Sequence, residues 1–293
     1  MIMTTKQKIK RKLKNLVSFL LHGNPDIITA NVVTMAPSEL LQGRCALITG
    51  GTSGIGFNIA KAFLNAGATV IITGRSRERL DKACAALGCD GRVYSFVMDS
   101  TRVNSFEPTL NDMLATVKRG GVNCIDILVN NAGVLGASLP NATEEVYDAV
   151  LDTNVKGVFF LSQLIGKYMK DNRIKGNILN IASSSSLRPA SSAYTISKWG
   201  IRGLTKGLAK SLAPYGITVN GLAPGPTATP MLMKEGETNL IKKIPLGRYI
   251  LPEEIANMAV FLVSGMGRPI IGDIVYMTGG AGVITYDDMA YNF

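Results

Sequence analysis

The sequence predicts an α/β protein built on a doubly wound parallel sheet, and three observations support this fold class. From Gly43 onward, short β-branched runs alternate with longer helical segments. Runs such as ILVN and VIIT are apolar at nearly every position, which suits strands that helices cover on both faces. A glycine-rich turn follows the first of these runs. Alternation of strand and helix is typical of right-handed crossover units that build one parallel sheet.

Each expected strand corresponds to one apolar run. The runs span residues 44–50, 68–74, 93–99, 125–131, 176–182, 216–223 and 272–279. Helices are expected near residues 55–66, 77–87, 102–118, 143–170, 192–213 and 252–264. Because no change of composition interrupts this series, residues 43–293 are expected to form a single domain, and residues 1–42 a basic N-terminal extension.

The extension carries much of the positive charge of the chain. The net charge is +10, and six lysines and arginines lie between residues 6 and 14 with no acid before Asp26. Subtracting these six from +10 leaves +4, an ordinary balance, so a nucleic-acid partner is not expected. Apolar residues recur opposite the lysines at helical spacing, which predicts an amphipathic helix. We expect this helix to pack on its own domain or on a neighbouring subunit, and contact with a membrane surface is the alternative.

Several classes of protein are disfavoured by the remaining composition. No apolar run approaches the roughly 20 residues that a membrane-spanning helix needs. The four cysteines form no CxxC pair, and His22 is the single histidine. Neither a metal site nor a disulfide framework is therefore expected, and reduced thiols in the cytoplasm are the default.

The motif TGGTSGIG (49–56) lies between the first expected strand and the first expected helix. Gly50, Gly54 and Gly56 would allow a tight turn, close approach of a pyrophosphate to the backbone, and close packing of the helix on the strand. The start of that helix would offer unpaired N–H groups to the phosphates. The motif in this position predicts a dinucleotide-binding site.

The segment YTISK places a tyrosine and a lysine four residues apart, at Tyr194 and Lys198. Residues at this spacing lie on one face of a helix, so the ammonium would lie near the phenol. A nearby positive charge favours the phenolate and would lower the tyrosine pKa. Tyr194 is therefore a candidate general acid or base near neutral pH.

These motifs, in this order, resemble those of the classical short-chain dehydrogenases/reductases, and in particular members of the 3-oxoacyl-(acyl-carrier-protein) reductase type. The resemblance covers about Gly43 to Gly280. It is carried by TGGTSGIG, NNAG (130–133), TNVKG (153–157), YTISK and APGPTATPM (223–231). It implies a Rossmann-type sheet of about seven parallel strands, and an oxidoreductase that interconverts a carbonyl and a secondary alcohol by hydride transfer, with Tyr194 as proton donor or acceptor.

The resemblance also implies a catalytic serine at the end of the fifth strand. The family's usual spacing of thirteen residues before the tyrosine would place it at Ile181, which has no hydroxyl. Aligning the strand NILNIAS instead selects Ser183, with a connecting loop two residues shorter than usual and Ser185 as the fallback. Ser184 and Ser185 are expected at the substrate mouth, whereas Ser191 and Ser192 would cap the helix that carries Tyr194.

By the same resemblance, Asn154 completes a catalytic group with Ser183, Tyr194 and Lys198. Its side chain would hold a water that links Lys198 to solvent, and Lys198 would also hold the nicotinamide ribose. The expected cofactor-binding residues are Gly50, Thr52, Ser53, Gly54, Ile55, Gly56, Arg75, Ser76, Asp99, Ser100, Asn131, Ala132, Gly133, Tyr194, Lys198, Pro224, Gly225, Thr227 and Thr229.

Cofactor preference is expected to depend on the end of the second strand. Relatives that prefer NAD carry an acid there, which binds the adenosine ribose and repels a 2′-phosphate. Here the position is Gly74, followed by Arg75 and Ser76. Since an arginine can bind a phosphate bidentately, NADP is the expected cofactor and NAD the alternative.

The substrate is left open by the sequence. A segment with an apolar face and several lysines (231–249) occupies the place of the family's substrate lid. A 3-oxoacyl thioester, a ketosteroid, a sugar or a small ketone all fit. The rival functions are an NAD-dependent alcohol, sugar or steroid dehydrogenase and a non-catalytic cofactor-sensing protein. By resemblance, a homo-oligomer, a tetramer or dimer, is expected.

Overall fold

The computed structural model describes residues 39–88, 91–233 and 244–282. In this part of the chain, seven parallel strands form one sheet in the order β3-β2-β1-β4-β5-β6-β7. The strands are β1 (Cys45–Thr49), β2 (Thr69–Gly74), β3 (Val93–Val97), β4 (Ile127–Asn130), β5 (Asn177–Ile181), β6 (Thr218–Pro224) and β7 (Ile274–Met277). The predicted doubly wound sheet is confirmed.

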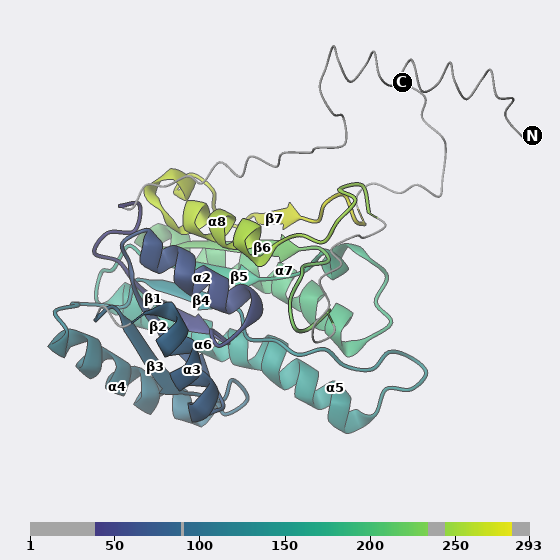
Figure 1. Ribbon diagram of the computed structural model, residues 1–293, viewed down its shortest axis with the longest axis horizontal. Helices are drawn as coiled ribbons and strands as arrows, with labels where there is room; N and C mark the ends of the chain where they lie inside the picture. The colour runs from purple at the N-terminus through teal and green to yellow at the C-terminus, as the bar shows by residue number, and fades with distance from the viewer. Residues whose placement is uncertain (1–38, 89–90, 234–243, 283–293) are drawn as a thin grey trace, which may run out of the picture. The chain divides into compact units, whose positions relative to one another are not determined.

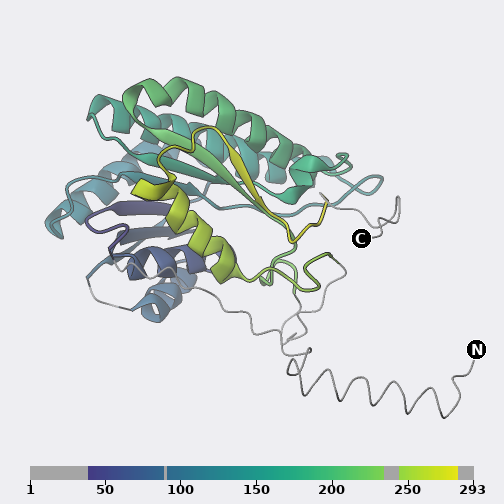
Figure 2. The same ribbon diagram turned by 90° about the horizontal axis from the view of Figure 1, so that it is seen from above.

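Helices cover both faces of the sheet (Figures 1 and 2). The α-helices are α2 (Gly54–Asn65), α3 (Arg77–Leu87), α4 (Phe106–Arg119), α5 (Glu144–Leu151), α6 (Gly157–Asp171), α7 (Ala193–Leu212) and α8 (Pro252–Val263). Residues of α2, α3 and α8 share one buried apolar cluster, and those of α4, α6 and α7 share the other. Neighbouring strand residues alternate between the two clusters: Ala46 and Ile48 belong to the first, and Cys45 and Leu47 to the second.

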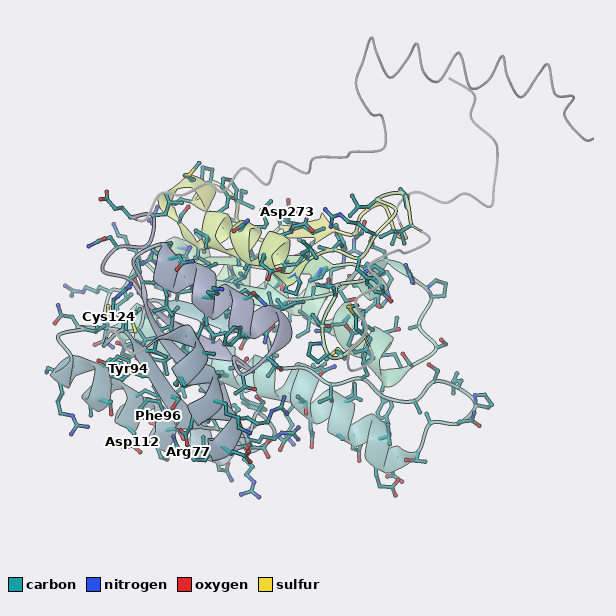
Figure 3. The ribbon with its side chains drawn as sticks, in the orientation of Figure 1. Arg77, Tyr94, Phe96, Asp112, Cys124 and Asp273 are labelled. Carbon is teal, nitrogen blue, oxygen red and sulfur yellow. The ribbon has the colours of Figure 1, made fainter. Side chains whose placement is uncertain are left out.

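The edge strands are less buried than the central ones: the residues of β3 are half-buried or exposed, and three of the four residues of β7 are half-buried. Tyr94 and Phe96, labelled in Figure 3, pack on the apolar cluster that includes Phe106 and Met113 of α4. Tyr94 also approaches Gly120, the residue that ends α4, so closely that a side chain there would collide with the phenol. One helix therefore covers this edge on one face.

The order of the strands reverses between β1 and β4. The chain passes from β1 to β2 and β3 on one side, and then returns to β4, β5, β6 and β7 on the other. In open sheets of this kind, ligands bind beyond the carboxyl ends of the strands at the reversal point. The topology therefore directs attention to the loops after β1 and β4.

A polar clamp joins the amino ends of β1, β4 and β5, opposite to that crevice. Arg44 pairs with Asp126 through Nε, and its Nη2 donates to Asn177 Oδ1 at 2.7 Å. Asp126 Oδ1 accepts from the backbone N–H of Cys45 at 2.8 Å, and Asn177 Nδ2 donates to Thr218 Oγ1 at 2.6 Å. Each strand start is thus tied to its neighbour by side chains as well as by the sheet ladder.

The predicted helix over 143–170 is interrupted in the structure. Between α5 and α6 lies a π-helical segment, η2 (Asp152–Lys156), which has one residue more per turn than an α-helix. The predicted helix over 102–118 likewise begins with a short 3-10 turn, η1 (Val103–Ser105), before α4. A further 3-10 turn, η3 (Ser184–Leu187), follows β5 where the sequence predicted a loop.

The packed domain already includes Leu41, which is fully buried and whose N–H donates to Ala66 O at 2.8 Å. The rest of the expected extension, with its amphipathic helix, lies outside the described residues. Among residues 39–88, 91–233 and 244–282, none of the helices combines the length and apolar character that a membrane crossing requires. The same ranges contain no group of three or more candidate metal ligands.

Candidate active site

A cavity of about 580 Å³ opens at the carboxyl ends of the strands, on both sides of the reversal point. Its walls come from the loops after β1 to β6, together with the start of α7. Its volume lies in the range typical of ligand sites. All the residues predicted to bind a cofactor line this cavity except Gly56, and three of the four predicted catalytic residues do so as well, Asn154 lying behind the wall.

The glycine-rich turn after β1 has the backbone geometry that a phosphate requires. Gly50 and Gly54 have φ angles of +64° and +56°, a region that residues with a side chain rarely adopt. A Cβ at Gly56 would lie 2.5 Å from Gly50 O and 2.3 Å from Asn131 Nδ2, so this glycine allows α2 to pack tightly on the loops after β1 and β4. Gly56 therefore supports the cavity from behind.

The start of α2 has no side-chain cap. Ser53, its N-cap residue, accepts no hydrogen bond through its hydroxyl, so the first N–H groups of the helix are not capped by it. Ser53, Gly54 and Ile55 line the cavity. A helix start that presents backbone N–H groups and the positive end of the helix dipole to a cavity fits an anionic pyrophosphate.

Asn131, after β4, holds the turn in place from the other side of the reversal point. Its Nδ2 donates to Thr49 O at 2.9 Å and to Gly50 O at 3.0 Å. The hydroxyl of Thr49 in turn accepts from the N–H groups of Asn131 and Ala132, both at 3.0 Å. The loops after β1 and β4 are thereby fixed to each other, with Asn131, Ala132 and Gly133 in the cavity wall.

Tyr194 and Lys198 lie in the first turns of α7, which Ser192 caps by accepting from Thr195 N–H at 3.2 Å, as predicted. Lys198 is buried, and its Nζ donates to Ile181 O at 2.8 Å and lies 5.6 Å from the centre of the Tyr194 ring. Burial lowers the pKa of Lys198 from 10.5 to about 8. Its ammonium is therefore held beside the end of β5 with one protein acceptor.

The pKa of Tyr194 differs in direction from the sequence expectation. Burial raises it above its ordinary value of 10, and a side-chain hydrogen bond with Ser183 opposes the rise. The Lys198 ammonium, 5.6 Å from the ring centre, is not among the causes of the shift and does not offset the burial. With the protein groups alone, Tyr194 is a neutral phenol that is ready to donate a proton.

Ser183 lies at the end of β5, where the strand alignment predicted it. Its hydroxyl accepts from Ser185 N–H at 3.1 Å, which caps η3. Ser184 and Ser185 line the cavity beside it. Of the serines weighed from the sequence, Ser183 is the one whose side chain affects the pKa of Tyr194, which it lowers.

Asn154 is buried in the π-helical segment η2. Its Oδ1 accepts from Val134 N–H at 2.9 Å, and its Nδ2 donates to Val134 O at 3.0 Å and to Ser197 Oγ at 3.1 Å. A Cβ at Gly133 would lie 3.4 Å from Asn154 Oδ1 and 3.8 Å from Lys198 Nζ, so the amide and the ammonium flank this glycine. Both amide hydrogens are used within the protein, which leaves one lone pair of Oδ1 for a water.

Two arginines and one acid define the end of the cavity beyond β2 and β3. Arg75 and Arg79 line it with Ser76, whose hydroxyl accepts from Arg79 N–H at 3.3 Å and caps α3. Asp99 Oδ1 accepts from Thr101 N–H at 2.9 Å and Thr101 Oγ1 at 2.8 Å. Burial favours the neutral form of Asp99, but these bonds together with nearby Arg75 and Arg102 lower its pKa overall.

The loop after β6 completes the wall. Gly225 lies so close to Thr278 that a Cβ would be 2.6 Å from its carbonyl oxygen. Thr227 Oγ1 donates to Gly225 O at 3.0 Å, and Thr229 lies 3.5 Å from the position of a Cβ on Gly54. Pro224, Gly225, Thr227 and Thr229, all predicted from the sequence, therefore line the cavity, and Thr229 lies against the glycine turn.

Sequence reasoning missed several residues of the cavity wall. Among them are Arg79, Met98, Leu135, Thr153 and Arg188. Arg79 has a signal that could have identified it, since it lies in the first turn of the expected helix 77–87, directly after Arg75 and Ser76. The apolar Met231 and Leu232, predicted as part of a lid, do line the cavity, whereas residues 234–243 of that segment lie outside the described residues.

Comparison with known proteins agrees with this geometry. The short chain dehydrogenase family model matches residues 44–240. The chain is 37% identical over 247 residues to a 3-oxoacyl-(acyl-carrier-protein) reductase of Thermotoga maritima, with 82% of this chain and 98% of the relative covered. It is 38% identical over 250 residues to a 3alpha-hydroxysteroid dehydrogenase of Mediterraneibacter gnavus, with 83% and 98% covered. A gluconate 5-dehydrogenase of Gluconobacter oxydans is 36% identical over 249 residues, with 82% and 95% covered.

Solved structures match over the same span. A 3-ketoacyl-(acyl-carrier-protein) reductase from Brucella melitensis complexed with NADH has a TM-score of 0.75 at 30% identity, with 83% of this chain and 100% of that chain covered. A blue fluorescent protein from a metagenomic library in complex with NADPH has a TM-score of 0.73 at 30% identity, with 83% and 99% covered. The chain thus belongs to the short-chain dehydrogenase family and is an NAD(P)-dependent oxidoreductase that acts on CH–OH and C=O groups.

Proposed function

We propose that this protein is an NADP(H)-dependent reductase that interconverts a ketone and a secondary alcohol, with Tyr194 as the proton donor or acceptor. The observation that carries the proposal is that Ser183, Tyr194 and Lys198 line the same cavity as the glycine-rich turn, with Lys198 Nζ 5.6 Å from the centre of the Tyr194 ring. A 3-oxoacyl thioester is the substrate class that we put first.

The residues of the cavity fit a dinucleotide. The uncapped start of α2 suits the pyrophosphate, Asp99 and the loop after β4 suit the adenosine, and Lys198 suits the nicotinamide ribose. When bound, the nicotinamide supplies or takes up the hydride. A Cβ at Gly50 would lie 3.0 Å from the Ala132 Cα, so only glycine fits this close approach of the two loops. Because glycine has no side chain, the backbone of the turn is free to contact the phosphates.

In the direction of reduction, the Tyr194 hydroxyl donates its proton to the carbonyl oxygen of the substrate. The raised pKa of Tyr194 keeps it protonated at neutral pH, which suits this role. The Ser183 hydroxyl donates to the same oxygen and stabilises the negative charge that develops there. Lys198, together with a water on Asn154, would return a proton to Tyr194 between turnovers. In oxidation the same groups act in reverse.

NADP is favoured over NAD by the charges beyond β2. Arg75 and Arg79 line the cavity with exposed side chains, and no acid stands at Gly74. Two guanidinium groups can bind a 2′-phosphate through charge-assisted hydrogen bonds. An aspartate at Gly74 would also crowd Thr52, since a Cβ there lies 3.0 Å from Thr52 Cγ2. The alternative is NAD, with Asp99 as the main polar contact of the adenosine.

The substrate class follows from the relatives and the apolar wall. Several relatives are named 3-oxoacyl-(acyl-carrier-protein) reductases, while others are named for a hydroxysteroid or a sugar acid. Leu135, Met231 and Leu232 bring exposed apolar surface to the cavity, which suits an acyl chain or a steroid better than a neutral sugar. An NAD-dependent alcohol, sugar or steroid dehydrogenase is the alternative enzyme.

A homo-oligomer in the cytoplasm completes the proposal. The side chains of Tyr147 on α5, Phe159 and Phe160 on α6 and Trp199 on α7 are exposed, and exposed aromatic groups of this kind suit an interface between subunits. The described cysteines Cys45, Cys84 and Cys124 are free, as expected in a reducing compartment.

The test is a panel of ketones, among them a 3-oxoacyl thioester, assayed with NADPH and NADH for the wild type and Tyr194→Phe. We expect the wild type to consume NADPH with at least one ketone. Tyr194→Phe should retain less than a few per cent of the rate while still binding NADPH, since it lacks the donated proton but keeps the ring. A cofactor-sensing protein would bind NADPH equally in both forms and reduce none of the ketones.

A further inference from the structure

Arg188 is a cavity residue that the reaction proposed above does not use. It ends η3, the four-residue turn that Ser183 caps, and it lines the cavity together with Ser183 and Tyr194. At about 2 Å per residue of 3-10 helix, its Cα lies roughly 10 Å from that of Ser183. Arg188 is therefore within reach of the part of the cavity where Ser183 and Tyr194 would hold a substrate.

The backbone of Arg188 is fixed from two sides. Its N–H donates to Ser185 O at 3.1 Å, and its carbonyl accepts from Trp199 Nε1 at 2.9 Å. The side chain is located by a third segment: a Cβ at Gly282 would lie 3.1 Å from Arg188 Nε and 3.4 Å from Nη2. The guanidinium thus lies against the backbone that follows β7, although Arg188 as a whole is exposed.

No described residue provides an acceptor or a counter-ion for this guanidinium. The ion pairs and side-chain hydrogen bonds found across the described ranges do not include it. The charged side chains in the cavity wall are Arg75, Arg79, Asp99, Arg188 and Lys198. Among the described residues of the wall, the single acid is Asp99, which follows β3 and is engaged with Thr101. The described residues near Ser183 and Tyr194 therefore bring positive charge to the wall without a carboxylate.

We propose that Arg188 is a specificity-determining residue that binds a carboxylate, or an equivalent anionic group, on the ketone substrate. Lys198 is not available for this role, because it is buried against Ile181 O. A guanidinium that lines a cavity and has no partner among the described residues can bind a planar carboxylate through two parallel hydrogen bonds. The inference rests on the proposed function and narrows it to oxo acids and anionic acyl derivatives, in preference to neutral ketones.

The test compares ketones that differ only in charge. Levulinate and 5-oxohexanoate are each assayed beside their methyl esters with saturating reduced cofactor. We expect the wild type to favour at least one acid over its ester. Arg188→Met, which keeps the length of the side chain, should lower kcat/KM for that acid by about ten- to hundredfold and leave the ester within about twofold. Arg188→Lys keeps the charge but loses the two parallel donors of the guanidinium. Its kcat/KM for the acid should lie between those of the wild type and Arg188→Met.

The control is Arg119→Met. Arg119 ends α4 on the side of the sheet away from the cavity and should change neither substrate. A second measurement needs no turnover: calorimetric titration of hexanoate and hexanamide into the protein saturated with oxidised cofactor. Hexanoate should bind more tightly than hexanamide to the wild type, and Arg188→Met should remove the difference.

The outcomes separate this inference from the proposed function. The inference is wrong if ketones are reduced but kcat/KM for the acids does not depend on Arg188, or if Arg188→Met lowers kcat/KM for acid and ester equally. In either case the proposed reductase activity is unaffected. If no ketone is reduced while hexanoate binds in an Arg188-dependent way, the carboxylate site stands and the reductase does not. Equal binding of hexanoate and hexanamide to the wild type would also overturn the inference.

Discussion

Replacing Lys198 by methionine removes an amine that the fold buries at a cost in stability. Burial lowers the pKa of Lys198 from 10.5 to about 8. At about 1.4 kcal/mol per unit of pKa, this fall corresponds to a penalty of about 3 kcal/mol for burying the charged amine. Methionine removes the penalty but also the hydrogen bond to Ile181 O, for which about 1.5–3 kcal/mol is typical when the donor is charged. At pH 7 the cofactor-free variant should therefore be as stable as the wild type or up to about 1.5 kcal/mol more stable.

The difference in stability between the wild type and Lys198→Met should depend on pH, and its sign can be worked out from the pKa of Lys198. Below pH 8 the amine is charged in both the folded and the unfolded chain, so the burial penalty is present in full. Above pH 10.5 it is neutral in both states and the penalty is absent. Between these values the unfolded chain binds more protons, and the wild type should gain about 3 kcal/mol relative to Lys198→Met. The order of stability should therefore reverse as the pH rises.

The assay is urea unfolding of both proteins without cofactor at several values between pH 7 and pH 10. Lys206→Met, an exposed lysine on the same helix, is the control and should show no pH-dependent difference from the wild type. Added NADP should stabilise the wild type more than Lys198→Met, because the ammonium is also proposed to hold the ribose. A stability difference between wild type and Lys198→Met that stays constant with pH would refute the reasoning.

Two further predictions concern the substrate and the cofactor. Ser183→Ala should lower kcat by about 10²-fold, the scale for one lost donor to a developing oxyanion, whereas Ser185→Ala should mainly raise KM; steady-state kinetics that rank them the other way would move the catalytic serine to 185. Arg75→Ala should weaken NADPH by about ten- to hundredfold and NADH hardly at all, and Arg79→Ala should act in the same direction. Arg77→Ala is the matched control, since this arginine, labelled in Figure 3, lies between the other two on the chain but is not among the residues that line the cavity; fluorescence titration that finds all three alike would refute the phosphate site.

The strands were predictable because burial on both faces leaves a direct trace in the sequence. Runs such as VIIT have no polar alternation, and all seven expected strands are present with ends that shift by a few residues. The residues of the glycine turn and of the loops after β4 and β6 were predictable for a related reason. Their spacing is set by close backbone contacts, such as that of Gly56 with Gly50 O, and these contacts allow few residue types.

Other properties depend on three-dimensional packing and left no such trace. The pKa of Tyr194 is dominated by burial, which the spacing of a tyrosine and a lysine does not report. The sequence placed Arg188 within a serine-rich segment, but its position in the cavity wall depends on Gly282, about ninety residues away along the chain. The π-helical break between α5 and α6 was also not predicted, because the periodicity of apolar residues does not reveal one additional residue in a turn.

That additional residue has a consequence for how the chain can vary in length. Removing one residue from the segment 152–156 would leave a regular α-helix with the same number of turns, because the extra residue is taken up within one wide turn. Helices α5 and α6 would keep their orientation about the helix axis, so the contact of α5 with α7 and the place of α6 in the core would remain. The turn itself would change, and Asn154, which is buried there and bonded to Val134 and Ser197, would lose its position. A one-residue deletion within η2 is therefore expected to spare the fold and to disturb the site. Length, as much as residue identity, is constrained at Asn154.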